Sequence, residues 1–298
     1  MSERAAAHGA RLRAVLDARW PEWGVAELAL VGTGLDAAVF RAESRAFGEV
    51  AIRAPWTRWI SNDNDPSQDA RALLATEQLL ANHMLAHGVP APRAFALHRG
   101  DDDFDFLVSA YIPDDAGDED PAAFGAVLRR IHGAPVTAEI SRALGQADLA
   151  ATLATRLTER LAVVRRLSGE PLREVSPAGL RELLAGARYQ PSVLHMDARR
   201  ANIRVEAGEL RAILDWSNAL LGDPALELAR AAEYGVRSPA FEAGYGALPP
   251  APAELEAVYR LDTAVMLAVV FLSEDPDPAP ARHQIERVHE LLAVPGVP

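Results

Sequence analysis

The spacing of apolar and polar positions predicts a β-rich first part of the chain. Residues 3–19 carry apolar side chains at the interval of an amphipathic helix, and Pro21 and Gly24 end this pattern. Three short runs with strand-like alternation follow, at residues 27–31, 38–43 and 49–54. Because the connections between them are too short for parallel crossovers, we expect an antiparallel meander.

A single long helix is predicted within this first part. A polar stretch typical of a loop precedes residues 69–87, which place leucines along one helical face. Ser67 or Asp69 is expected to cap the start of this helix. Two further strands are predicted at 93–98 and 104–111, joined by an aspartate-rich turn that we expect to be solvated.

Beyond Pro113 the pattern becomes mostly helical. Helical periodicity is found at residues 121–132, 146–167, 177–187, 224–234, 252–272 and 280–293. One β-hairpin interrupts it, with strands at 203–205 and 212–214 around a turn at Ala207-Gly208. We therefore expect an α+β protein, with a small antiparallel sheet and one long helix in residues 1–112 and a larger, mostly helical part in residues 113–298.

Two residue types are absent, and each absence excludes a class of chemistry. The 298 residues contain no cysteine, and all 30 Lys+Arg positions are arginine. Without cysteine there is no thiol nucleophile, no disulfide and no Cys-ligated zinc. Without lysine there is no Schiff base to pyridoxal phosphate and no Walker A phosphate loop, which requires Gly-Lys-Ser/Thr.

The charge balance narrows the range of partners. With 30 basic and 42 acidic residues, the formal net charge is −12. We therefore expect no binding to nucleic acid or to an anionic membrane surface, since both need a cationic face. The longest apolar run, at 264–272, is far shorter than the ~20 residues of a membrane span. Because the N-terminal residues also lack a signal-peptide pattern, a soluble cytoplasmic protein is expected.

The segment between residues 194 and 216 carries the candidate chemistry. It reads His195-x-Asp197-x-x-x-x-Asn202, and the predicted hairpin then ends at Asp215-Trp216. Phosphoryl transfer explains this spacing: one carboxylate must orient an attacking hydroxyl and accept its proton, and an amide oxygen and a second carboxylate must hold Mg²⁺ against nucleotide phosphates. Asp197 is therefore the candidate catalytic base, and Asn202 and Asp215 are the candidate metal ligands.

These motifs resemble those of the aminoglycoside phosphotransferase and choline kinase family, from about residue 25 to about residue 235. The family's catalytic loop usually reads His-Gly-Asp-x-x-x-x-Asn, its metal strand reads Ile-Asp-Trp, and Gly222-Asp223-Pro224 is a further marker here. The resemblance implies a two-lobed, protein-kinase-like fold. Residues 1–112 would form the nucleotide-covering N-lobe, and residues 113–298 a helical C-lobe with the catalytic loop, the metal site and the acceptor site. ATP or GTP and Mg²⁺ are the implied cofactors.

The resemblance also implies a set of nucleotide-binding residues upstream of the motif. The loop with Gly32, Thr33 and Gly34 would cover the phosphates. Arg53 stands where the family places its phosphate-contacting basic residue, and Glu77 on the long helix would pair with it.

Further residues receive roles from their positions in the family pattern. Ser109 and Tyr111 would lie in the hinge that contacts the nucleotide base. Arg199 would stabilise the transferring phosphoryl group, and a solvated surface arginine is an equal alternative. In antibiotic kinases of this family, acidic residues near the C-terminal helices bind cationic sugars, a role open here to Asp262, Glu274, Asp275 and Asp277.

Three positions depart from the family pattern. Met196 replaces the usual Gly of the catalytic loop, Glu227 stands where Asp is usual, and Arg53 replaces the best-known Lys. An arginine is permanently charged and bidentate toward phosphate oxygens, so it can serve in that place with altered geometry.

The motif leaves the acceptor open. The favoured prediction is transfer of the γ-phosphoryl group to a hydroxyl of a small molecule, such as an antibiotic, an amino alcohol or a sugar-like compound. One alternative is a kinase acting on Ser/Thr hydroxyls of a peptide in a biosynthetic pathway. The other is a nucleotide-binding pseudokinase, which Met196 and Arg53 would favour and the intact Asp197, Asn202 and Asp215 would disfavour.

Overall fold

The chain divides into two compact units. The computed structural model describes residues 3–65, 67–145, 148–249 and 251–298. The N-terminal unit comprises Met1–Ser61, Ser67–Glu119 and Arg200–Ser217, and the C-terminal unit comprises Asn62–Pro66, Asp120–Arg199 and Asn218–Pro298. The sequence did not predict that residues 62–66 group with the C-terminal unit, or that residues 200–217 group with the N-terminal unit. The sequence-based division between residues 112 and 113 stays a prediction.

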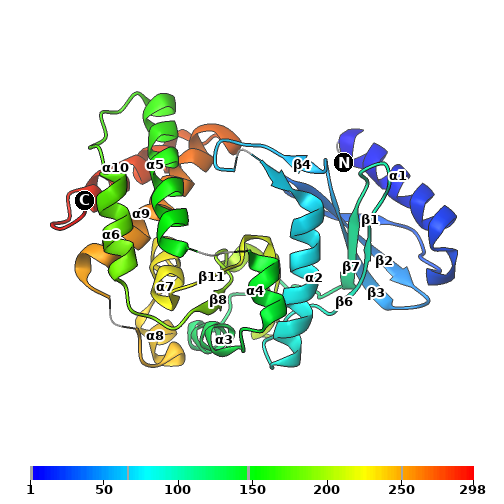
Figure 1. The fold of residues 1–298 in the computed structure, drawn as a ribbon. Coiled ribbons are helices and arrows are strands. Elements are labelled where there is room, and N and C mark those ends of the chain that lie inside the picture. Colours follow the sequence, from blue (N-terminus) through cyan, green and yellow to red (C-terminus); the bar gives the residue numbers. More distant parts are fainter. Residues whose placement is uncertain (1–2, 66, 146–147, 250) are drawn as a thin grey trace. The chain divides into compact units, whose positions relative to one another are not determined.

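A five-stranded antiparallel sheet forms the centre of the N-terminal unit (Figure 1). Its strands, in spatial order, are β1 (Ala29–Thr33), β2 (Ala37–Ser44), β3 (Gly48–Pro55), β7 (Phe106–Ala110) and β6 (Ala94–His98). Every neighbouring pair is antiparallel. The predicted meander of the first three strands is therefore confirmed.

Two helices cover opposite faces of this sheet, because successive side chains along a strand alternate between its faces. Phe106 and Val108 of β7 pack in one cluster with Leu12 of α1 (Glu3–Arg19). Leu107, between them, instead packs with Leu74 of α2 (Ala70–Ala86). Each fully buried side chain of this size stabilises the fold by about 1.5–3 kcal/mol.

The start of α2 agrees with one of the two predicted caps. Asp69 is the N-cap residue, and its side chain accepts a hydrogen bond of 3.0 Å from the backbone N–H of Arg71. Asp69 also belongs to a short two-stranded ladder, β4 (Trp59–Ile60) with β5 (Gln68–Asp69). A 3₁₀ turn, Pro21–Trp23, follows α1.

The predicted hairpin within residues 203–214 is present, and it belongs to the N-terminal unit although the sequence placed it in the mostly helical second part. It pairs β9 (Ile203–Glu206) with β10 (Glu209–Ile213) and follows a 3₁₀ turn at Arg200–Asn202. Both turn residues, Ala207 and Gly208, have positive φ angles of 53° and 78°, as tight hairpin turns require.

The acidic segment after β7 is exposed, yet two of its carboxylates bind the β9–β10 hairpin. Asp114 accepts a hydrogen bond of 3.0 Å from Val205 N–H and pairs with Arg200, and Asp115 accepts one of 2.7 Å from Ala207 N–H. These carboxylates fasten the β9–β10 hairpin because they satisfy backbone donors that the two-stranded ladder leaves open.

Helices dominate the C-terminal unit. They are α3 (Pro121–Gly133), α4 (Ala138–Leu144), α5 (Leu149–Ser168), α6 (Pro177–Gly186), α7 (Pro224–Glu233), α8 (Pro239–Tyr245), α9 (Ala253–Val269) and α10 (Pro278–Leu292), with a π turn at Val270–Glu274. A short antiparallel pair joins β8 (Ser192–Leu194) to β11 (Leu220–Gly222). The predicted helix at 146–167 begins on residues 146 and 147, which lie outside the described residues.

Four short elements of this unit escaped prediction, namely α4, α8, β8 and β11. Each has only three to seven residues, too few for a periodic pattern to emerge. Close packing holds α8 in place: a Cβ added at Gly244 would lie 1.9 Å from the Ala122 carbonyl oxygen of α3, and one at Gly125 would lie 2.0 Å from the Phe241 carbonyl oxygen. Glycine is required at both positions because the two backbones touch.

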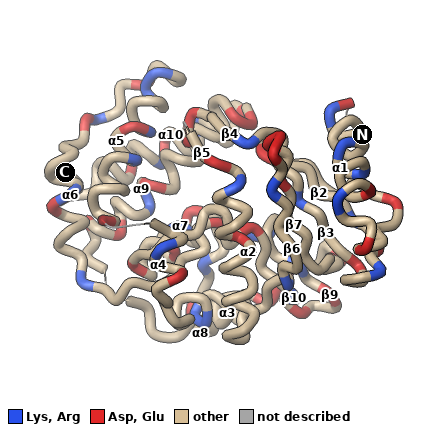
Figure 2. The backbone as a smooth tube through the Cα atoms, turned by 45° about the vertical axis from the view of Figure 1, so that its right-hand side comes forward, with Lys and Arg blue, Asp and Glu red and all other residues tan. Residues whose placement is uncertain are grey.

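Charged residues are distributed over both units (Figure 2). Since the chain has no lysine, every blue segment in that view is an arginine. None of the helices in the described part of the chain is both long and apolar enough to cross a bilayer.

Candidate active site

One guanidinium group holds two carboxylates together in the N-terminal unit. Arg53, on β3, donates from Nη1 to Glu77 Oε2 of α2 at 2.8 Å and to Asp215 Oδ1 at 2.7 Å. The Arg53 and Glu77 side chains are only 22% and 13% exposed. Although burial disfavours the charged form, Glu77 and Asp215 raise the pKa of Arg53 above its ordinary value. The structure thus brings together three predicted site residues that lie far apart in the chain.

The same cluster raises the pKa of Glu77. Burial has the largest effect, Asp215 adds to it, and Arg53 opposes it, with the result that the pKa of Glu77 is about 7. A carboxyl group at this pKa changes its charge near neutral pH.

Asn202 and Asp215 lie at the open end of the β9–β10 hairpin. The Asn202 carbonyl accepts a hydrogen bond of 2.7 Å from Leu214 N–H, beside Asp215. Asp215 has a φ of 63°, a left-handed conformation that Asp adopts more readily than most residues. Ser217 Oγ–H donates to Asp215 Oδ1 at 2.6 Å, which holds the carboxylate in this turn.

This pair of oxygen donors fits Mg²⁺. A magnesium ion in a nucleotide site takes one or two protein oxygens and completes its shell with phosphates and water, so a closed protein cage is not needed. On this donor chemistry, Asn202 and Asp215 are the residues that would hold the ion.

The glycine-containing loop links β1 to β2. Gly32 and Thr33 belong to the end of β1, and Gly34 N–H donates to the Ala37 carbonyl at 2.9 Å. Trp56 Nε1–H donates to the Gly34 carbonyl at 3.1 Å, so this tryptophan braces the loop. Leu35 at the loop tip is 57% exposed.

The predicted hinge residues lie at the end of β7. Ser109 is in register with Ala51 of β3, and Tyr111 follows the last residue of the strand. Tyr111 N–H donates to the Glu49 carbonyl at 3.0 Å, and Arg41 lies over its ring at 4.6 Å.

The predicted catalytic base belongs to the C-terminal unit. Asp197 Oδ1 accepts hydrogen bonds of 2.9 Å from both Tyr234 Oη–H and Arg199 Nε–H. The Asp197 side chain is 13% exposed and that of Arg199 is 50% exposed. Buried His195 accepts from Asp197 N–H at its Nδ1, 3.2 Å away, and so braces the loop as expected.

Glu227 on α7 holds the backbone just before the base. Its carboxylate accepts from His195 N–H at 3.0 Å and from Met196 N–H at 2.6 Å. It also accepts a hydrogen bond of 2.8 Å from His132 Nε2–H. Although burial favours the neutral form, the hydrogen bond from His132 lowers the pKa of Glu227. The buried carboxylate therefore stays charged and binds both loop amides.

These contacts explain how the loop accommodates Met196. Its φ is 64°, the left-handed region that suits the glycine usual in the family. This conformation costs a non-glycine residue about 1–2 kcal/mol. The Met196 amide is bound by Glu227, its carbonyl accepts from Arg230 Nη1–H, and its side chain is buried in the helical core.

Sequence reasoning missed two residues of this site. Tyr234 contacts the base directly, and Arg230 holds the Met196 carbonyl. Neither belongs to the motif, and the only available signal was the helical spacing that places Arg230 and Tyr234 one turn and two turns after Glu227.

Two of the four acidic residues considered for a cationic substrate have partners within the protein. Asp262 is 2% exposed and accepts two hydrogen bonds from Arg156, at 3.0 and 2.7 Å. Glu274 accepts from Asn64 N–H at 3.0 Å.

Comparison with known proteins gives the family. The model of the phosphotransferase enzyme family, APH, matches residues 27–258. The chain therefore belongs to this family, and it is a phosphotransferase with an alcohol group as acceptor. No curated protein matches the sequence significantly.

Solved structures share the fold at low sequence identity. A choline/ethanolamine kinase family protein from Mesorhizobium loti is 20% identical, with a TM-score of 0.62 over 97% of this chain and 96% of that chain. The GDP complex of wild-type aminoglycoside 2'-phosphotransferase-IIIa is 14% identical, with a TM-score of 0.63 over 96% and 98%. A thermostable mutant of aminoglycoside phosphotransferase APH(4)-Ia, bound to ADP and hygromycin B, is 15% identical, with a TM-score of 0.55 over 94% and 97%. The expected α+β, two-lobed, protein-kinase-like fold is confirmed.

Proposed function

We propose that this chain transfers the γ-phosphoryl group of ATP or GTP to a hydroxyl of a small molecule. The observation that carries the proposal is the cluster of Arg53, Glu77 and Asp215 in a chain that belongs to a phosphotransferase family. Arg53 would bind nucleotide phosphates through its fork of N–H donors. Glu77 would hold it in place, and the loop at Gly32–Gly34 would cover the phosphates.

The proposed chemistry needs one proton acceptor and a site for the metal. Asp197 would orient the acceptor hydroxyl and take its proton, and the hydrogen bond from Tyr234 keeps the carboxylate in one orientation. Asn202 and Asp215 would hold Mg²⁺, which neutralises phosphate charge when bound. Arg199 already pairs with Asp197 through Nε–H, so its proposed contact with the phosphoryl group would use the N–H donors of its Nη atoms.

Ser109 and Tyr111 complete the proposed nucleotide-binding residues. Their position at the end of β7, where the chain leaves the strand for the acidic segment, supports a hinge role. Nucleotide complexes among the similar structures contain GDP in one case and ADP in another, so both base types are proposed substrates.

A small-molecule acceptor is favoured over the two alternatives. The similar structures include complexes with kanamycin and with hygromycin B, both small molecules rich in hydroxyl groups, and nothing supports a peptide. The two departures that favoured a pseudokinase are accommodated. Arg53 pairs with Glu77, and Met196 adopts the conformation of the glycine it replaces.

The test is an Asp197→Ala variant assayed with Mg·ATP and Mg·GTP against a panel of aminoglycosides, amino alcohols and sugars. We expect turnover to fall by about 10²–10⁴-fold, because the general base is lost, with nucleotide affinity nearly unchanged. Glu286→Ala, at an exposed position of α10 in the same unit, is the matched control and should keep full turnover. Wild-type turnover in Asp197→Ala would refute the proposed base.

A further inference from the structure

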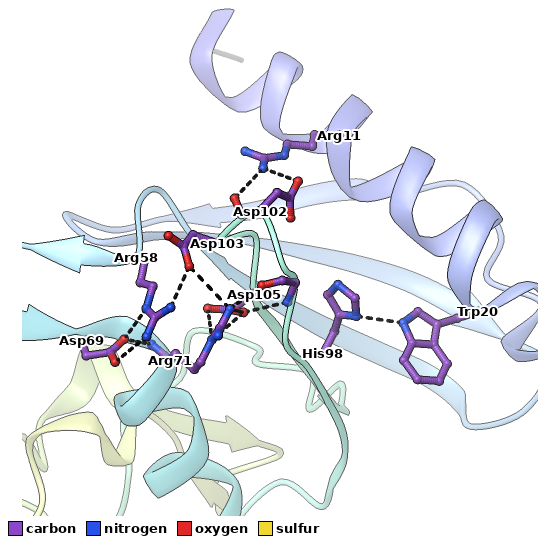
Figure 3. Close-up of polar contacts among 10 residues, drawn as sticks. Arg11, Trp20, Arg58, Asp69, Arg71, His98, Asp102, Asp103 and Asp105 are labelled. Carbon is purple, nitrogen blue, oxygen red and sulfur yellow. Dashed lines mark hydrogen bonds and ion pairs between the residues drawn. The ribbon is translucent and has the colours of Figure 1, made fainter.

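A cluster of five charged residues surrounds the start of α2 (Figure 3). We call it the α2 clamp, and its members are Arg58, Asp69, Arg71, Asp103 and Asp105. All five belong to the N-terminal unit, and none is part of the family motif. Their contacts join the first turn of the helix to the β6–β7 turn and to the segment before β4.

The centre of the clamp is a buried carboxylate with a bidentate partner. Asp105 is 4% exposed, and it accepts hydrogen bonds from Arg71 Nε–H at 2.9 Å and Nη2–H at 2.8 Å. Gly100 N–H also donates to Asp105 at 3.0 Å, and Arg71 Nη2–H donates to the Gly100 carbonyl at 2.5 Å. The fork of Arg71 therefore fixes the helix against the turn in one geometry.

Arg58 ties the same turn to the N-cap of α2. Its Nη1–H donates to Asp103 at 2.7 Å, and its Nε–H and Nη2–H donate to the two oxygens of Asp69, each at 3.2 Å. Asp69 also caps the helix through Arg71 N–H. Outside the clamp, Arg11 of α1 binds Asp102 of the same turn at 2.7 Å.

Stability alone is a weak reason to bury such a carboxylate. Removing charges from water is unfavourable, and well-packed apolar residues of similar size often stabilise a fold as much or more. Hydrophobic contacts are non-directional, so an apolar cluster would let the helix slide against the turn. A bidentate ion pair fixes the relative position of the two groups.

The helix that the clamp fixes also carries Glu77. Arg71 and Glu77 are six residues apart, a rise of about 9 Å along a continuous helix. A displacement or rotation of the first turn of α2 is therefore transmitted to Glu77, whose contact with Arg53 is a single hydrogen bond of 2.8 Å.

We propose that Arg71 and Asp105 are positioning residues for the nucleotide site, because they hold α2 in the register that lets Glu77 bind Arg53. They touch neither the nucleotide nor the metal, and they act through Glu77. The inference rests on the proposed function, since it assigns Arg53 and Glu77 to nucleotide binding.

The test is a double-mutant cycle on Mg·ATP affinity, measured by direct binding. Asp105→Asn should raise the Kd about fivefold in the wild-type background, and Glu77→Gln should raise it at least as much. In the Glu77→Gln background, Asp105→Asn should change the Kd by less than about twofold, because the contact it positions is already lost. Hydrogen exchange at the α2 amides should accelerate in Asp105→Asn.

Asp17→Asn is the matched control, because it removes an exposed ion pair with Arg13 of α1 in the same unit and should leave the Kd unchanged. Should Asp105→Asn fail to fold, Arg71→Lys keeps the charge but loses the fork and should give the same pattern in weaker form.

Additive effects of Asp105→Asn and Glu77→Gln, or an unchanged Kd in Asp105→Asn, would overturn the positioning role and leave the proposed function standing. An unchanged Kd in Glu77→Gln would overturn both, because the nucleotide role of the Arg53–Glu77 pair would then be wrong.

Discussion

At the scale of single residues, the absence of lysine means that an arginine, Arg53, must supply the positive charge at the proposed phosphate site. A guanidinium keeps its charge at any accessible pH and presents several N–H donors. In Arg53, the Nη1 atom donates to both Glu77 and Asp215. This arrangement places two carboxylates around one cation. Burial and the nearby charge of Asp215 disfavour a second negative charge, and they therefore raise the pKa of Glu77.

A pH dependence of stability follows from Glu77. Its pKa rises from 4.5 to about 7 on folding, so between these values the folded chain keeps a proton that the unfolded chain has lost. The free energy of unfolding should therefore fall as the pH rises through this range. Glu77→Gln removes this effect, so wild type should lose about 2 kcal/mol relative to the variant between about pH 5 and about pH 8.

Urea denaturation of both proteins at the two pH values measures this difference. Glu49→Gln, at an exposed position of the same unit, should follow the wild type across the range. A constant difference between wild type and Glu77→Gln would show that Glu77 is ionised at both pH values.

At the scale of elements, α7 organises the catalytic loop. Helical spacing places Glu227, Arg230 and Tyr234 so that they contact the backbone and the side chain of the loop that holds Asp197. The sequence predicted both the helix and the loop. In the sequence, Glu227 stands out only as a departure from the usual Asp, and the structure shows that its carboxylate binds two amides of the loop.

Glu227→Ala tests this organisation. The change leaves two loop amides and His132 without their buried acceptor, and we expect the free energy of unfolding to fall by about 3 kcal/mol. Turnover should fall further than stability explains, since the loop before Asp197 loses its support. Glu286→Ala, at an exposed position of α10, is the control for thermal and chemical denaturation. Equal stability of the two variants would contradict the role of Glu227 as the acceptor that supports the catalytic loop.

Elements with long periodic patterns were the easier ones to predict. The sheet strands and helices such as α2 and α5 have enough residues for a period to emerge, while α4 and α8 have seven residues each. The aspartate-rich turn before β7 was expected to be solvated, yet Asp105 is buried, because its partner Arg71 comes from another element.

At the scale of the whole molecule, binding of a nucleotide should appear as added stability. A ligand that binds only the folded state at about 100 times its Kd stabilises by about 2.7 kcal/mol, enough to raise the Tm by several degrees. We expect this rise with Mg·ATP or Mg·GTP and a smaller one with EDTA present. Asp215→Ala should abolish the magnesium-dependent part, because a metal ligand is lost. An identical shift with and without magnesium would contradict the assignment of Asn202 and Asp215.

The same measurement identifies the acceptor class. Hydroxyl-bearing antibiotics, amino alcohols and sugars, added with a nonhydrolysable nucleotide, should raise the Tm further only when they bind the folded chain.

The sequence by itself determined the class of chemistry and most of the secondary structure. Motif spacing selects Asp197, Asn202 and Asp215, and composition excludes lysine and cysteine chemistry, because both are properties of the chain read locally. Only the tertiary structure decided that Arg53 binds Asp215, 162 residues away, and that Arg71 clamps Asp105. Such contacts depend on how the elements pack, and a local sequence pattern does not predict which distant side chain a buried charged group will bind.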